Sequence, residues 1–133
     1  MMGQGLAAMA SPSSADVHFQ LGECLYRLGN SAAALERYYV AVEQDHDFLE
    51  AWTQIGCLHR DLGELKSAAL AFEVALDVYP DYPEAHYFLA EVLNELDDPD
   101  AAAEHWSAYL RHDRRGPWAE NAQQRLDQLS LRL

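Results

Sequence analysis

Apolar side chains recur along most of this chain at the three- and four-residue spacing of a single helix face. Leu21, Cys24, Leu25 and Leu28 show this spacing in the first segment, and mainly polar residues fill the positions between them. Apolar residues with this period form a stripe along an amphipathic α-helix. The pattern therefore predicts that the chain is helical throughout from Ala15 onward.

The same pattern repeats with a period of 34 residues. Gly22, Gly56 and Ala90 occupy equivalent positions in three successive segments. The other matching sets are Leu21, Ile55 and Leu89; Leu28, Leu62 and Leu96; Ala34, Ala68 and Ala102; and Tyr38, Phe72 and Trp106. A fixed period of this length is typical of stacked copies of one small helical unit. We predict three such units, over 15–48, 49–82 and 83–116, and a closing helix over 117–130.

Glycine, aspartate and proline mark where the predicted helices begin and end. Gly29 and Gly63 are expected to end the first helix of their units, because glycine readily adopts the left-handed conformation found there. Asp97 takes this place in the third unit, and aspartate tolerates the same conformation at some cost. Helix starts are marked by Pro83, by Asp98-Pro99 and by Gly116-Pro117.

The two ends of the chain differ from the repeating part. Residues 1–13 have no helical period and are expected to be a disordered leader, with Ser13 or Ser14 capping the first helix. The closing helix has one apolar side, formed by Trp118, Ala122, Leu126 and Leu129. Its other residues are polar and are expected to face away: Glu120, Asn121, Gln123, Gln124, Asp127 and Gln128. A terminal helix of this kind can end a helical stack in water.

These positions give the chain a family resemblance, and unit 49–82 carries it most fully. That unit contains Trp52, Ile55, Gly56, Gly63, Ala68, Phe72, Ala75 and Pro80 at characteristic intervals. The pattern resembles the tetratricopeptide repeat (TPR). The resemblance implies an all-α fold, a right-handed TPR superhelix of three antiparallel helix pairs with a C-terminal capping helix. It also implies one TPR domain over 15–133.

The repeated small residues predict how the helices of a unit pack. Gly22, Gly56 and Ala90 are expected to lie where the first helix meets the second, opposite Ala34, Ala68 and Ala102. A larger side chain there would overpack the joint. The rings of Tyr38, Phe72 and Trp106 are expected to fill the space toward the next unit. Tyr109 stands where the family has a small residue, which predicts a looser or differently angled contact with the closing helix.

The composition narrows the classes of partner. The net charge is −13, and an acidic surface repels phosphate backbones and anionic membranes. We therefore expect no nucleic acid and no membrane as partners of this domain. The two cysteines, Cys24 and Cys57, form no CxxC pair, which is consistent with reduced thiols and a cytoplasmic location. The alternative reading of the acidic charge is a merely solvated surface.

We find no sequence signal for catalysis, a metal or a cofactor. The six histidines include no HExxH motif and no pair at i and i+4, and His18, His59 and His86 stand where packing rings are expected. The chain has no nucleophile elbow, phosphate loop or dinucleotide fingerprint. Cys57 is predicted to be a small side chain that lines the groove. The alternative is a reactive thiol whose pKa is lowered by Arg60, three residues later.

The resemblance places a concave binding groove mainly on the first helix of each unit. We predict that a partner binds there to Phe19, Glu23, Tyr26, Glu50, Thr53, Cys57, Arg60, Glu84, Tyr87, Glu91 and Asn94. Acidic side chains are the most numerous class in the predicted groove, and Phe19, Tyr26 and Tyr87 add rings that can anchor an apolar side chain. We therefore expect a protein or peptide partner that carries Lys or Arg together with an apolar anchor.

TPR proteins that bind chaperone C-termini hold the terminal carboxylate with Lys, Asn and Arg. The matching positions here are Phe19, Glu23, Gln54, Glu84 and Phe88, so this clamp is absent and an acidic C-terminal peptide should be repelled.

Two alternatives to a simple binding module remain at the level of sequence. The stretch from Glu104 to Leu126 resembles the TPR tails of some bacterial MerR-type transcription regulators, which favours a regulatory module. The first helix carries Val17, Phe19, Leu21, Leu25 and Tyr26 with no polar helix ahead of it. Such an edge favours a self-associating structural domain, a homodimer through the N-terminal edge.

Overall fold

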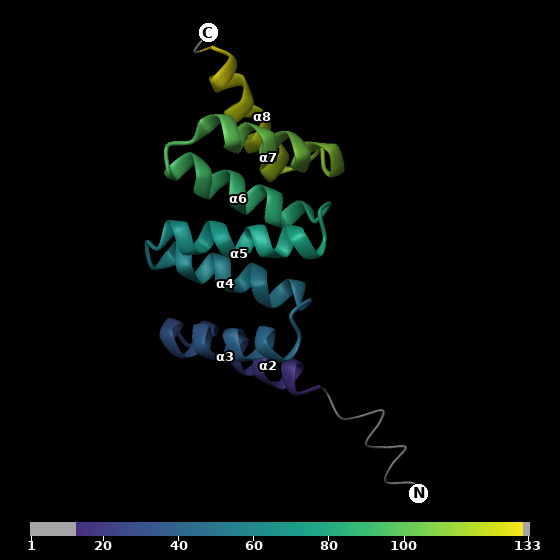
Figure 1. The fold of residues 1–133 in the computed structure, drawn as a ribbon. Helices are drawn as coiled ribbons and strands as arrows, with labels where there is room; N and C mark the ends of the chain where they lie inside the picture. Colours follow the sequence, from purple (N-terminus) through teal and green to yellow (C-terminus); the bar gives the residue numbers. More distant parts are fainter. Residues whose placement is uncertain (1–12, 132–133) are drawn as a thin grey trace, which may run out of the picture. The chain divides into compact units, whose positions relative to one another are not determined.

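The computed structural model describes residues 13–131, and within this range all regular elements are α-helices (Figure 1). They are α2 (Ser14–Arg27), α3 (Ser31–Gln44), α4 (Leu49–Asp61), α5 (Leu65–Val78), α6 (Pro83–Glu95), α7 (Pro99–His112) and α8 (Pro117–Ser130). None of these helices is long and apolar enough to cross a membrane. The predicted leader lies outside the described residues except for Ser13.

The chain divides into two compact units, Met1–Ala51 and Trp52–Leu133, so that the boundary lies within α4. In the first unit, α2 packs against α3. α2 begins with a capping box: the Ser13 hydroxyl accepts a bond from the Asp16 N–H, and the Asp16 carboxylate accepts one from the Ser13 N–H. Ser13, and not Ser14, is therefore the residue that caps the first helix.

In the second unit, each of α5, α6 and α7 packs against the helix that follows it (Figure 1). Gly56 of α4 lies against the ring of Phe72 in α5, and a Cβ added at Gly56 would come within 2.5 Å of that ring. Gly22 meets Tyr38 in the same way in the first unit, at 2.7 Å. These two rings therefore pack on the glycine of their own repeat. Phe72 also packs toward the next repeat, as expected, against Leu89 and Val92 and against Phe88 at 5.6 Å between ring centroids.

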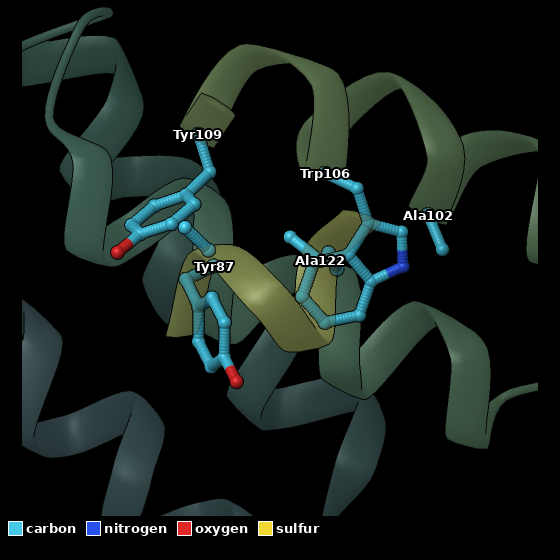
Figure 2. Close-up of a cluster of buried hydrophobic side chains, with 7 residues drawn as sticks. Tyr87, Ala102, Trp106, Tyr109 and Ala122 are labelled. Carbon is cyan, nitrogen blue, oxygen red and sulfur yellow. The ribbon is translucent and has the colours of Figure 1, made fainter. Parts of the chain in front are cut away.

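The core of the second unit has two clusters. One joins α5 to α6 through Ala68, Phe72, Leu89 and Val92. The other joins α6, α7 and α8 through Tyr87, Ala102, Trp106, Tyr109 and Ala122 (Figure 2). Tyr109 is buried within this cluster, which contradicts the looser of the two contacts with α8 that the sequence suggested; a differently angled contact stays a prediction.

The predicted helix boundaries are confirmed in the described residues. Gly29 and Gly63 both have φ +79°, and Asp97 is the corresponding non-glycine residue at φ 63°. The Asp98 carboxylate accepts a hydrogen bond from the Ala101 N–H at 3.3 Å, which caps α7. Proline occupies the first turn of α6, α7 and α8.

Candidate functional site

The residues predicted to line a groove in the first unit are not equally accessible. Phe19 is buried, and its ring centroid lies 4.8 Å from that of Phe48 and 5.7 Å from that of Tyr38. Phe19 is therefore a core residue of this unit and not an exposed anchor. Glu23 is half-buried and accepts a hydrogen bond from the Tyr38 hydroxyl. Tyr26 is half-buried and Glu50 is exposed.

In the second unit, Arg60 of α4 joins two carboxylates of α6. Its Nη1 donates to Glu91 Oε1 at 2.8 Å, and its Nε and Nη2 donate to Glu95 Oε1 at 3.0 and 2.6 Å. Burial alone would lower the pKa of Arg60, but the hydrogen bonds and charges of the two glutamates raise it overall. Arg60 therefore neutralises part of the predicted acidic groove.

A small polar cavity of about 50 Å³ adjoins this ion-pair cluster. Asn94, Trp106 and Arg125 line it together with Arg60, Glu91 and Glu95. Of the predicted residues, Arg60, Glu91 and Asn94 thus lie together, and Arg125 of α8 is an addition that the sequence reasoning missed.

Cys57 lies beside Arg60 in α4, but its thiol is not activated. Burial raises the pKa of Cys57 to about 12, and the nearby Asp61 carboxylate adds to the increase. Arg60 acts in the opposite direction, but its effect is outweighed. The alternative of a lowered Cys57 pKa is therefore wrong, because desolvation disfavours a thiolate more than one neutralised arginine can stabilise it. Thr53, one turn earlier, is buried.

Aromatic rings from α6 and α8 form the centre of the candidate site. The Tyr87 and Trp118 rings stack with centroids 4.5 Å apart and an interplanar angle of 18°. Tyr87 also meets Tyr109 and Trp106 edge-on, each at 5.2 Å, which Figure 2 shows from within the cluster. Tyr87 itself is buried, whereas Trp118 keeps 39 % of its surface exposed. A partner in this region would therefore contact Trp118 and not the face of Tyr87.

The polar end of Tyr87 is held by α8. Asn121 Nδ2 donates to the Tyr87 hydroxyl at 2.9 Å. Burial raises the pKa of this hydroxyl, and the bond from Asn121 partly offsets the increase. Asn121 was predicted to face away from the core. That prediction is wrong, because a tyrosine hydroxyl at the edge of the cluster needs a polar partner.

A pocket of about 370 Å³ opens beside Trp118, where α6 and α8 begin and α7 ends. Its lining is Pro83, Glu84, Tyr109, Asp113, Arg115, Gly116, Pro117 and Trp118. Asp113 accepts hydrogen bonds from the Tyr109 hydroxyl at 2.5 Å and from the Arg115 N–H at 3.2 Å. These bonds lower the pKa of Asp113, so its carboxylate stays charged at neutral pH. Burial and the neighbouring carboxylate raise the pKa of Tyr109.

The sequence contained a signal for the α8 residues of this site. Trp118, Asn121 and Arg125 follow Glu84, Tyr87 and Glu91 by one period of 34 residues. Extending the groove positions of the repeats into the closing helix would therefore have identified all three. The hydrogen bond between the Tyr109 hydroxyl and Asp113, the C-cap residue of α7, has no such signal in the repeat.

A pair of histidines lies on another side of α6. Nδ1 of His86 and Nδ1 of His105 in α7 are 2.9 Å apart, and His86 Nε2 lies 2.7 Å from the Pro80 carbonyl oxygen. Burial is the main cause that lowers the pKa of both histidines. Among residues 13–131 no group of three or more His, Cys, Asp or Glu side chains is placed to hold a metal ion.

A protein-family model matches most of this chain. A family model described as tetratricopeptide repeat matches residues 4–47 and 53–117. No curated protein sequence matches the chain.

Three solved structures have a similar fold, as their TM-scores show. The first TPR of Spaghetti (RPAP3), bound to the HSP90 peptide SRMEEVD, is 16 % identical, with a TM-score of 0.81 over 88 % of this chain and 95 % of that one. The Yersinia enterocolitica type III secretion chaperone SycD, in complex with a peptide of the translocator YopD, is 14 % identical, with a TM-score of 0.83 over 92 % and 96 %. The Arabidopsis OM64 TPR domain is 16 % identical, with a TM-score of 0.80 over 87 % and 96 %.

Proposed function

Because this chain belongs to the tetratricopeptide repeat family, we propose that it is a protein–protein interaction module that binds a segment of another protein without catalysing a reaction. Two structures of similar fold hold peptides, of HSP90 in one and of the translocator YopD in the other. That likeness supports peptide binding as the mode of interaction. The chemistry of the peptide has to be argued from the residues of this chain.

The observation that carries the proposal is the pocket beside Trp118. It combines a half-exposed indole with the carboxylates of Glu84 and Asp113. The flat face of an indole attracts a cation, and a nearby carboxylate adds charge complementarity. A Lys or Arg side chain of the partner, preceded or followed by an apolar residue, suits this lining. Arg115 stands at the rim and disfavours a second cation there.

The same residues argue against an acidic partner at this pocket. Glu84 and Phe88 occupy two of the positions where carboxylate-clamping TPR proteins carry polar or basic side chains. Phe88 packs against Phe72 at 5.6 Å and against Trp118 at 5.3 Å, so it cannot hold a carboxylate. We therefore propose a preference for basic over acidic segments, with Glu91 and Glu95 committed to Arg60 and not to the partner.

Fluorescence anisotropy with two labelled peptides tests the proposal. The peptides share an apolar core and differ only in carrying Lys or Glu around it. We expect the Lys peptide to bind at least about tenfold more tightly than the Glu peptide. Trp118→Ala and Glu84→Gln should each weaken the Lys peptide, since each removes one part of the pocket.

Tyr79→Ala is the matched control, because Tyr79 is a more exposed ring that stacks on Tyr82, outside the pocket lining. Circular dichroism of each variant verifies that it folds. Equal binding of the two peptides, or full binding by Trp118→Ala, would contradict the proposal.

A further inference from the structure

A second groove lies between α7 and α8, apart from the pocket at Trp118. It has a volume of about 520 Å³, and its lining includes Leu110 and Arg111 from α7, Arg114 from the segment between the two helices, and Glu120, Gln123 and Leu126 from α8. The arginines are exposed and the two leucines are half-buried. The groove thus has an apolar floor between two cationic side chains and one carboxylate.

The 34-residue period identifies what this groove corresponds to in the preceding repeat. Glu120, Gln123 and Leu126 follow His86, Leu89 and Val92 by one period. In that earlier seam, between α5 and α6, Leu89 and Val92 are almost completely buried, and α7 contacts His86 through His105. In the preceding repeat, α7 therefore lies against this seam at His86. Among the described residues, no helix follows α8 to cover its counterpart.

The seam between α5 and α6 and the groove between α7 and α8 differ in charge at equivalent positions. Asp77 and Asp81 precede Arg111 and Arg115 by one period. His112, in the last turn of α7, approaches Asp81 with its Nε2 3.9 Å from Oδ1. A helix placed on the α7–α8 groove as α7 is placed on the earlier seam would therefore bring its last turn to Arg115, which directly follows Arg114 of the groove lining. An acidic residue there would complement them, and the negative end of the helix dipole would add to the attraction.

We propose that the groove between α7 and α8 binds an amphipathic helix of another protein, with small and apolar residues on one side and Asp or Glu in its last turn. The partner helix takes the place that the second helix of a further repeat would have. Its apolar side covers Leu110 and Leu126, and its acidic turn pairs with Arg111 and Arg114. This surface is distinct from the pocket at Trp118 and has the opposite charge preference.

The test uses two stapled, fluorescein-labelled helical peptides with the same Ala and Leu side. One carries Glu in its last turn and the other carries Lys. We expect the Glu peptide to bind the full chain at least about tenfold more tightly than the Lys peptide at low ionic strength. The double variant Arg111→Glu/Arg114→Glu should reverse this order. Amide shifts in two-dimensional NMR spectra should be confined to α7 and α8.

The control is Arg27→Glu/Lys66→Glu, which makes the same change in net charge at two exposed positions outside the groove lining. It should keep the order of the wild-type chain. The proposal is overturned if wild type binds both peptides equally, or if the Arg111/Arg114 variant keeps the wild-type order. Concentration-dependent sedimentation of the wild-type chain that this variant loses would make a second copy the occupant, and would overturn the proposal of a foreign helix.

Discussion

At the scale of single residues, the most informative contacts are those between a helical glycine and an aromatic ring. Gly56 allows the Phe72 ring to lie directly on the α4 backbone, and Phe72 is completely buried. The ring has no free space into which it could move, since protein cores are close-packed. A side chain at position 56 must therefore push α4 away from α5.

Gly56→Val should lower the free energy of unfolding by about 2 kcal/mol, because the cost of overpacking a filled core exceeds the few tenths of a kcal/mol that valine gains over glycine in helix propensity. Urea denaturation followed by circular dichroism measures the change. Ala32→Val, at an exposed position of α3, is the control and should change stability by less than about 0.5 kcal/mol. A loss no larger than that of the control would show that Phe72 relaxes freely.

At the scale of elements, the joint between α6 and α7 contains a pair of histidines, His86 and His105, whose protonation depends on pH. His86 Nε2–H donates to the Pro80 carbonyl, so in the neutral ring Nδ1 is an acceptor and His105 Nδ1–H donates to it. When both rings are protonated, two N–H groups face each other. Neighbouring charges shift the two pKa values in both directions. Asp81 raises the pKa of His86, whereas Arg111 and His112 lower it, and Glu104 raises the pKa of His105.

The pKa values of both histidines are lowered in the folded chain, mainly by burial. Above about pH 7.5 both rings are largely neutral in the folded and the unfolded chain, and their linkage does not change stability. As the pH falls below this value, the unfolded chain takes up protons first, so stability decreases until the folded chain is also protonated.

We therefore expect the urea midpoint to fall between about pH 7.5 and about pH 5.5. His105→Gln should make this fall smaller, whereas His46→Gln, at an exposed position, should leave it unchanged. Identical pH profiles for wild type and His105→Gln would show that the pair does not contribute.

At the scale of the whole molecule, charge is distributed unevenly along the chain. The net charge of −13 comes from 22 acidic and 9 basic residues, and five of the arginines lie between positions 111 and 132. The two proposed surfaces of the second unit follow this distribution, because the pocket at Trp118 includes Glu84 and Asp113 and the α7–α8 groove includes Arg111 and Arg114. An overall acidic chain should attract basic partners over a distance set by ionic strength.

The association rate of the Lys peptide should therefore fall as salt is raised, by about tenfold or more between about 0.05 M and about 0.5 M NaCl. Stopped-flow fluorescence measures this rate. The dissociation rate should change much less, because it depends on contacts within the pocket. An association rate independent of salt would mean that the acidic surface does not guide the encounter.

Two interpretations of the whole chain stay predictions. The resemblance of the end of the chain to MerR-type tails favours a regulatory role. The apolar N-terminal edge favours a homodimer. At that edge Val17 and Leu21 are exposed and Leu25 and Tyr26 are half-buried, but Phe19 is buried against Phe48, so the accessible apolar edge is smaller than the sequence suggested.

The helices, their boundaries and the family can all be predicted from the order of residues. Periodicity, prolines and left-handed positions such as Gly63 and Asp97 are local properties, and each acts within one or two helical turns. The 34-residue period then identified the equivalent positions of each repeat. The same register also contained Trp118, Asn121 and Arg125, once it was extended into α8.

Which of these side chains are accessible and which are charged depends on how the helices pack. It buried Phe19, Thr53 and Tyr87, because packing depends on neighbours from other helices that no periodicity specifies. It paired Arg60 with Glu91 and Glu95, at separations of 31 and 35 residues, and left the Cys57 thiol protonated. Burial and ion pairing arise between helices, so pKa values and open pockets follow from the fold and not from the order of residues.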